Sequence, residues 1–362
     1  MGRSVRSSLA GALAAAWLFA ACTARADEVT RAAPTVGLSR NTPRVYVLTG
    51  AKIVAEPGKA YEKGAVVVRD GRIEAIGNLG ELTLPADAQV IDLSGKTIYP
   101  GLIDSYTEVA LAASTRERGA PYWNAYITPQ LSAAEQFSAD NDLNGKLRRQ
   151  GVVARLVAPS LGVIRGTSAI VSTGEANDSE AASGVPGNNA AIIADRVAQH
   201  LRLTVPRRQG RSEEYPASPM GAVALARQAF YDARWYDEAR KRAAGAGGTA
   251  PDADEALAAL APDAKGNALY IADAPNELFV LRADLFAREF GLNLAVRGSG
   301  YEYLRLEAVK QTGRTIITPV HFPKPPNVGS AQAAQAAALD DLLHWDMAPE
   351  NPARLEKAGV RI

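Results

Sequence analysis

The sequence contains one cysteine, almost no net charge and, beyond its first residues, no long apolar run. The balance of 40 Lys and Arg against 39 Asp and Glu gives a formal charge of +1, so no electrostatic footprint for nucleic acid or anionic lipid is present. No segment after residue 26 approaches the length and apolarity of a transmembrane helix. We therefore expect no nucleic-acid partner, no transmembrane segment and no disulfide framework.

The N-terminal residues have the composition of a secretory signal peptide. Arg3 and Arg6 form a basic start, and residues 9–21 form an uncharged apolar run that is short for a membrane span. Small residues at the third and the last position before a cut after Ala26 suit signal peptidase. We predict a signal peptide over residues 1–26 and a periplasmic or secreted mature protein; a retained membrane anchor is the alternative.

The lone cysteine, Cys22, lies inside this segment. The run at residues 19–22, Phe-Ala-Ala-Cys, loosely resembles a bacterial lipobox, so lipid anchoring through Cys22 is a second possibility. Cleavage after Ala26 instead leaves a mature chain without thiol chemistry. Residues 27–43 are polar and predict a flexible leader.

Residues 44–96 have the pattern of a small β subdomain. Asp70-Gly71 separates two apolar runs and suits a tight hairpin turn. We predict a small antiparallel sheet whose strands cover residues 45–48, 51–54, 65–69, 72–77 and 90–93.

From residue 97 to residue 362 the pattern changes to strands separated by helices. This alternation is typical of an α/β fold with a mainly parallel sheet or a (β/α) barrel. The predicted strands cover residues 98–104, 152–158, 268–272, 293–296 and 315–320, and the predicted helices cover residues 276–290, 300–312 and 331–343.

Two further helices have clear boundaries. Ser218 suits an N-cap and Pro219 a first helical position, which predicts a long helix reaching Ala244. Its aromatic residues (Phe230, Tyr231, Trp235 and Tyr236) favour packing in the core or between domains over a binding surface.

A short helix opens at Asn351-Pro352 and closes at Gly359, and residues 360–362 begin a strand. A strand of three residues leaves a ladder incomplete. We therefore expect a barrel that is incomplete at its C-terminus, from a truncated gene or a longer protein.

Residues 45–108 resemble the N-terminal portion of the amidohydrolase superfamily, especially its imidazolonepropionase-like and prolidase-like branch. The resemblance rests on residues 48–53 (LTGAKI), 68–77 (VRDGRIEAIG) and 90–104 (VIDLSGKTIYPGLID). It implies a (β/α)8 barrel that carries a small β-sandwich built from both chain ends. It also implies hydrolysis of C–N bonds by one or two divalent metals, held by a His-x-His pair after the first strand, histidines after the fifth and sixth, and an aspartate after the eighth.

At these positions the chain departs from the family. Tyr106 and Glu108 occupy the His-x-His positions, Ala272 or Asp273 the fifth-strand position, and Arg297 the sixth. A phenol stays protonated at neutral pH and a guanidinium cannot ligate a metal. We therefore expect no bound metal, with Glu108 and Asp273 as the only weak ligands for Zn²⁺ or another divalent ion.

The three histidines do not repair this deficit. His200 is expected on the surface in a polar helix-to-loop region, His321 at the end of the seventh strand, and His344 in a Pro-rich connection. The glycine-punctuated residues 162–168 favour a β-turn over an anion-binding nest.

Three functions stay open. The first is a catalytically impaired, exported family member that acts as a partner or binding subunit, for example in a hetero-oligomer with an active amidohydrolase. The second is a metal-dependent hydrolase of non-peptide or dipeptide C–N bonds with altered ligands. The third is a periplasmic solute-binding protein that holds a small carboxylated ligand through Arg297. The candidate pocket residues are Tyr106, Glu108, Asp273 and Arg297; alternatively, Arg297 and Glu108 form a structural ion pair that fills the vacated metal site.

Overall fold

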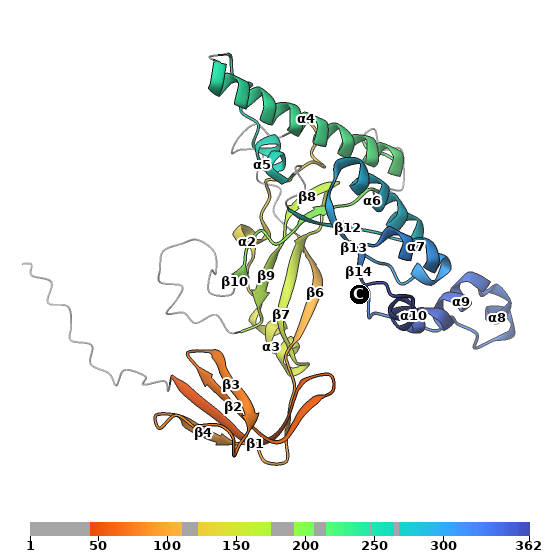
Figure 1. The fold of residues 1–362 in the computed structure, drawn as a ribbon. Coiled ribbons are helices and arrows are strands. Elements are labelled where there is room, and N and C mark those ends of the chain that lie inside the picture. The colour runs from red at the N-terminus through yellow and green to blue at the C-terminus, as the bar shows by residue number, and fades with distance from the viewer. Residues whose placement is uncertain (1–43, 111–121, 175–191, 206–214, 247, 264–267) are drawn as a thin grey trace, which may run out of the picture. The chain divides into compact units, whose positions relative to one another are not determined.

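The computed structural model describes residues 44–110, 122–174, 192–205, 215–246, 248–263 and 268–362. The chain divides into two compact units, Met1–Pro100 and Gly101–Ile362 (Figure 1). The predicted signal peptide, the leader and Cys22 lie outside the described residues. None of the described helices is both long and apolar enough to span a membrane.

The described part of the N-terminal unit is one mixed sheet with the strand order β3-β2-β1-β4, and β5 also pairs with β1. The first predicted pair of strands is a single strand, β1, because the chain continues through Gly50 with positive φ and a register shift. The antiparallel prediction is right for β1, β2 and β3 but wrong for β4, which pairs parallel with β1. β5, which the prediction did not include in this sheet, also pairs parallel with β1. The strands are β1 (Val45–Glu56), β2 (Lys59–Arg69), β3 (Arg72–Asn78), β4 (Gln89–Asp92) and β5 (Thr97–Ile98).

The core of this unit lies between β1 and β2. Burial alternates along β1, whereas residues 64–67 of β2 are all buried. Val45 and Val47 on β1 and Ala65 and Val67 on β2 are buried together. The turn after β2 is the predicted hairpin, with positive φ at Asp70 and Gly71. The described strands of this unit form a single layer, so the predicted sandwich is not seen among them.

The described residues of the second unit form two sheets. One has the order β10-β9-β7-β6 and the other the order β14-β13-β12-β11-β8, in which β11 to β14 are parallel. The predicted strand at residues 98–104 is divided into β5 and β6 by Tyr99, Pro100 and Gly101, since Pro100 has no N–H to donate. The strands are β6 (Leu102–Val109), β7 (Val152–Pro159), β8 (Ile164–Thr167), β9 (Ala169–Ser172), β10 (Ile192–Ala194), β11 (Gln199–Leu201), β12 (Leu269–Asp273), β13 (Asn293–Arg297) and β14 (Thr315–Ile317).

The described strands do not close into a barrel, because the two sheets are separate. The mixed α/β class is confirmed, but β14 ends at Ile317, three residues earlier than predicted, just before Thr318 and Pro319. At the C-terminus the Ile316 N–H donates to the Arg361 carbonyl at 2.9 Å. Residues 360–362, predicted to begin a strand, therefore contact β14 through one backbone hydrogen bond, but no strand is assigned there.

The helices mostly follow the sequence prediction. α4 begins at Pro219 behind Ser218, whose hydroxyl accepts from the Gly221 N–H at 3.2 Å. The predicted helices over residues 300–312 and 331–343 are each divided, the first into a 3-10 turn (η4) and α7, the second into α8 and α9. The helices are α2 (Ala133–Gln136), α3 (Asn141–Arg149), α4 (Pro219–Ala246), α5 (Glu255–Asp263), α6 (Glu277–Phe290), η4 (Glu302–Arg305), α7 (Leu306–Thr312), α8 (Ala331–Ala336), α9 (Leu339–Met347), η5 (Ala348–Glu350) and α10 (Asn351–Ala358).

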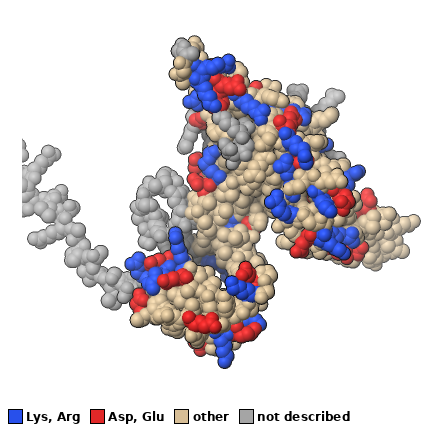
Figure 2. All heavy atoms as spheres, in the orientation of Figure 1, with Lys and Arg blue, Asp and Glu red and all other residues tan. Residues whose placement is uncertain are grey.

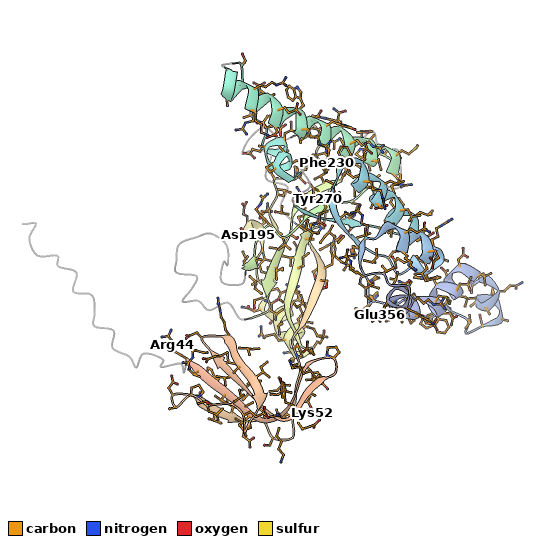
Figure 3. The ribbon with its side chains drawn as sticks, in the orientation of Figure 1. Arg44, Lys52, Asp195, Phe230, Tyr270 and Glu356 are labelled. Carbon is orange, nitrogen blue, oxygen red and sulfur yellow. The ribbon has the colours of Figure 1, made fainter. Side chains whose placement is uncertain are left out.

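The main core lies between α4, α6 and β12. Phe230 of α4 packs on Tyr270 of β12, with ring centroids 5.8 Å apart, and on Phe286 and Phe290 of α6 (Figure 3). Phe230 and Tyr236 are buried as predicted, whereas Tyr231 and Trp235 are 53% and 56% exposed. Core packing therefore accounts for only half of the aromatic residues of this helix. On the face drawn in Figure 2, basic and acidic side chains are interspersed rather than gathered by sign.

Candidate functional site

Charged and phenolic side chains converge within the second unit. Asp273 and Arg297 end the neighbouring strands β12 and β13 and are register partners. Because parallel strands end at one edge of a sheet, this register brings the two side chains to the same edge. We call the full set the arginine–carboxylate cluster; it consists of Tyr106 and Glu108 from β6, Arg165 from β8, Arg202 after β11, Asp273 and Arg297.

Arg165 and Arg202 each bridge both carboxylates. Nη1 of Arg165 lies 3.1 Å from Glu108 Oε1, and its Nη2 lies 2.9 Å from Asp273 Oδ2. Nη2 of Arg202 lies 2.6 Å from Glu108 Oε1 and 2.7 Å from Asp273 Oδ2. The Arg165 side chain is fully buried and the Asp273 side chain is 8% exposed, so these charges are removed from water and depend on one another.

Tyr106 lies between the two kinds of charge. Its hydroxyl donates to Asp273 Oδ1 at 2.8 Å and accepts from Arg165 Nη2 at 2.8 Å. The Arg297 guanidinium lies 4.5 Å from the centre of its ring, a cation–π distance. Burial, only partly offset by Arg165, raises the pKa of the Tyr106 hydroxyl, so the phenol is neutral and acts as a hydrogen-bonding bridge.

The ionisation of Asp273 is set by its basic neighbours. Burial by itself acts to raise the pKa of this carboxyl, but the guanidinium groups of Arg165 and Arg202 and hydrogen bonds from Arg202 and Tyr106 outweigh it. The pKa of Asp273 is therefore held below its ordinary value, and the group is a carboxylate at neutral pH.

His200 is not the surface residue that the sequence predicted. It lies in β11, is fully buried, and its ring packs on Tyr106 with centroids 5.6 Å apart. Neither ring nitrogen has a hydrogen-bond partner among the described residues. Burial and the nearby Arg165 lower the pKa of His200 to about 3, so the imidazole is neutral. Strand β11 is only three residues long, so its sequence carries too little periodicity to indicate a buried strand.

The other two histidines lie away from the cluster's charged contacts. His321 lies beyond the end of β14, exposed on a pocket wall. His344 lies in α9, rather than in an irregular connection, and stacks on Tyr301 at 3.6 Å.

The cluster does not suit a divalent metal. Both of its carboxylates are already bridged by guanidinium groups, and three such cations would repel a metal ion. Across the part of the chain that the structure describes, no three His, Cys, Asp or Glu side chains are gathered as a metal site. The residues of the cluster therefore do not fit the divalent metal ion that the family resemblance implies.

A pocket of about 590 Å³ adjoins the cluster. Arg202, Asp273 and Arg297 are its charged lining residues, and the rest of the lining is a mixture of apolar and polar residues. Its lining residues are Arg202, Thr204, Val205, Asp273, Ala274, Pro275, Arg297, Gly298, Ser299, Pro319 and His321.

The structure brings all four candidate residues together, and it adds two that sequence reasoning missed, Arg165 and Arg202. The expected β-turn at residues 162–168 is largely strand β8, and this strand carries Arg165 into the cluster. One feature of the sequence could have indicated Arg165, because it lies between Ile164 and Gly166 in a largely apolar segment. An arginine buried in such a segment needs a charged partner, since unpaired arginines are rarely buried. Two residues were candidates for the fifth-strand position. The Asp273 side chain is part of the cluster, whereas Ala272 is part of the hydrophobic core.

The fold and the site define a mixed α/β protein with polar groups at the carboxyl ends of parallel strands. No protein-family model matches the chain. It is 41% identical over 86 residues to imidazolonepropionase from Geobacillus sp. (21% of this chain, 20% of that protein) and 37% identical over 87 residues to imidazolonepropionase from Vibrio cholerae (21% of each). The chain thus spans about a fifth of the length of these curated relatives.

The structure of an amidohydrolase from Thermotoga maritima has a similar fold, with a TM-score of 0.64 at 18% identity, over 87% of this chain and 76% of that one. The chain is thus similar in sequence to imidazolonepropionases over about a fifth of its length and similar in fold to an amidohydrolase.

Proposed function

We propose that this chain is an amidohydrolase-family protein that holds no catalytic metal and acts as a binding or partner subunit rather than as a hydrolase by itself. The observation that carries the proposal is the fully buried Arg165 side chain, in contact with both Glu108 and Asp273. These are the only two carboxylates in the cluster, and the guanidinium supplies the positive charge that a metal would otherwise bring.

The same contacts argue against the alternative, a hydrolase of non-peptide or dipeptide C–N bonds with altered ligands. Metal-assisted hydrolysis needs a bound water whose pKa is lowered by the ion. Two of the positions where the resemblance implies histidine ligands are Tyr106, a neutral phenol, and Arg297. Neither side chain ligates a divalent ion at neutral pH.

We also propose that the strands of the second unit belong to a (β/α)8 barrel and that the N-terminal sheet is one layer of a β-sandwich. The parallel order of β11 to β14, with α6 and α7 following β12 and β13, supports the first part. The likeness in fold to the Thermotoga maritima amidohydrolase is consistent with it.

Export and partnership belong to the same proposal and rest on the sequence. The signal-peptide pattern over residues 1–26 supports a periplasmic or secreted protein. Intact mass of protein recovered from the cell envelope separates cleavage after Ala26 from lipidation at Cys22. For the partner role, native mass spectrometry with a metal-loaded family member from the same envelope is expected to show a hetero-oligomer; two unmixed species would contradict it.

The central test is metal content, measured by plasma mass spectrometry on the full chain. The protein is purified without chelator after expression with Zn²⁺, Mn²⁺ and Fe²⁺ supplied. We expect far less than one metal per chain. About one tightly held metal per chain would overturn the proposal, and a loss of both metal and activity in Glu108→Gln would then establish the hydrolase.

A further inference from the structure

Arg297 differs from the other two arginines of the cluster in how well it is paired. Its guanidinium approaches Glu108 and Asp273 only at 3.5 Å and 3.9 Å, and its side chain makes no hydrogen bond to any described residue. The side chain is 42% exposed, against 0% for Arg165 and 21% for Arg202. A guanidinium carries five donors in a planar fork, so Arg297 has donors to offer a ligand.

These donors border the pocket of about 590 Å³ described above. That volume lies within the usual range of small-molecule sites, about 300–1,000 Å³. The cation–π contact with the Tyr106 ring, at 4.5 Å, restrains the guanidinium group, which reduces the entropy lost when a ligand binds.

The cluster carries an unbalanced positive charge. Three guanidinium groups face two carboxylates, and the buried Tyr106 and His200 are neutral. The remaining ionisable side chain of the pocket wall is His321, which is exposed. Glu302, behind the pocket-lining Ser299, is engaged by backbone N–H groups and Asn351 rather than by a guanidinium, so Arg297 remains the cation with donors to offer. A planar carboxylate matches the fork of a guanidinium in both geometry and charge.

Part of the pocket lining suits an apolar body, although Thr204 and His321 line the pocket too. Val205, Ala274, Pro275 and Pro319 contribute apolar surface. The Ser299 hydroxyl is already engaged with Glu302 Oε1, at 3.3 Å, so it offers little to a polar ligand. A compact hydrocarbon group attached to the carboxylate would bury this surface without leaving polar atoms unpaired.

We propose that the pocket binds a small monocarboxylate with a compact apolar group, held by a bidentate contact from Arg297. The proposal rests on the proposed function, because a metal in the cluster would change the charge that the ligand balances. Arg165 and Arg202 hold the two carboxylates and leave Arg297 to the ligand.

The test is titration calorimetry on the full chain, in chelator and in a buffer free of carboxylate. The probes are phenylacetate and N-acetyl-L-valine, each paired with its primary amide. We expect saturable binding of at least one acid and none of its amide. Arg297→Gln should weaken that binding about tenfold to a hundredfold, the worth of a charged hydrogen-bonded contact. Arg297→Lys keeps the positive charge but lacks the planar fork, so its affinity for the acid should lie between those of the parent and Arg297→Gln.

The matched control is Arg305→Gln, which removes another exposed arginine whose ion pair, to Glu277, is long at 3.9 Å. It should leave binding unchanged. No saturable heat from either acid, equal binding of acid and amide, or binding of inorganic phosphate alone would overturn the inference. Metal content is measured on the same preparation, so a metal-loaded protein marks failure of the proposed function, and a metal-free protein that binds no acid marks failure of this inference only.

Discussion

Arg165 and Asp273 form an ion pair of 2.9 Å between two strands that are not adjacent, β8 and β12, and both side chains are almost completely removed from water. Strand β11 separates them in the sheet, and Arg202, which follows β11, contacts the same carboxylate oxygen. The Asp273 carboxylate therefore links three strands. The cluster is thus part of the protein core and also lines the pocket.

Arg165→Met tests the contribution of the buried guanidinium to stability. Loss of one partner of a buried ion pair costs about 3–5 kcal/mol, and we expect about 3 kcal/mol because Arg202 still pairs with both carboxylates. The measurement is urea unfolding. Arg354→Met, which breaks an exposed pair one helical turn apart with Glu350, should cost about 0.5 kcal/mol. A variant as stable as the parent would show that the fold does not depend on this charge.

His200 should make the protein sensitive to mild acid. Its pKa is about 3 in the folded state against an ordinary 6.5, so below pH 6.5 the unfolded chain takes up a proton that the folded chain refuses. Stability is therefore lost as pH falls from 6.5 toward 3, by about 2 kcal/mol at pH 5. The Asp273 carboxylate adds a further loss only below about pH 4, because its pKa is also lowered.

His200→Leu removes the group and should flatten the change in unfolding free energy between pH 7 and pH 5, measured by urea titration at both values. At pH 7 the variant should be at least as stable as the parent, because two unpaired buried nitrogens disappear. His321→Leu, at an exposed position, is the control and should leave the difference unchanged. A steep acid loss retained in His200→Leu would contradict the assignment.

Gly166→Ala tests the backbone that carries Arg165. Gly166 has φ +99°, and an added Cβ would meet the Leu131 carbonyl oxygen at 2.3 Å. Since backbone cannot yield as a side chain does, we expect a loss of about 3 kcal/mol from overpacking and positive φ together. Gly313→Ala has positive φ but open space, and should cost about 1–2 kcal/mol. Equal losses in thermal unfolding would mean that β8 moves freely away from residue 131.

Glu302 is expected to anchor the turn after β13. It is fully buried, and its carboxylate accepts from the backbone N–H groups of Ser299 and Gly300 and from the Asn351 amide. Glu302→Gln places an amide donor against these donors and should cost about 1–3 kcal/mol. Glu307→Gln, on the following helix, is the matched control and should be nearly neutral. Equal unfolding free energies for the two variants would show that Glu302 does not hold the turn.

The local elements of this fold could be predicted because their causes lie within a few residues. The Asp70-Gly71 hairpin, the Ser218-Pro219 start of α4 and the Gly359 end of α10 depend on the φ that each residue allows. The direction of pairing in the N-terminal sheet could not be predicted, because β4 and β5 pair with β1, which lies tens of residues away in the sequence.

The sequence by itself offered four candidate pocket residues, Tyr106, Glu108, Asp273 and Arg297. Only the tertiary structure decided what they do together. Arg165 and Arg202 join the cluster because β8 pairs with β11. This pairing joins segments that are distant in the sequence and depends on burial of the whole sheet. The same packing encloses the His200 ring, whose nitrogens have no hydrogen-bond partner in the part of the chain that the structure describes. Charge pairing depends on distances between atoms, and those distances are set by strand order rather than by spacing along the chain.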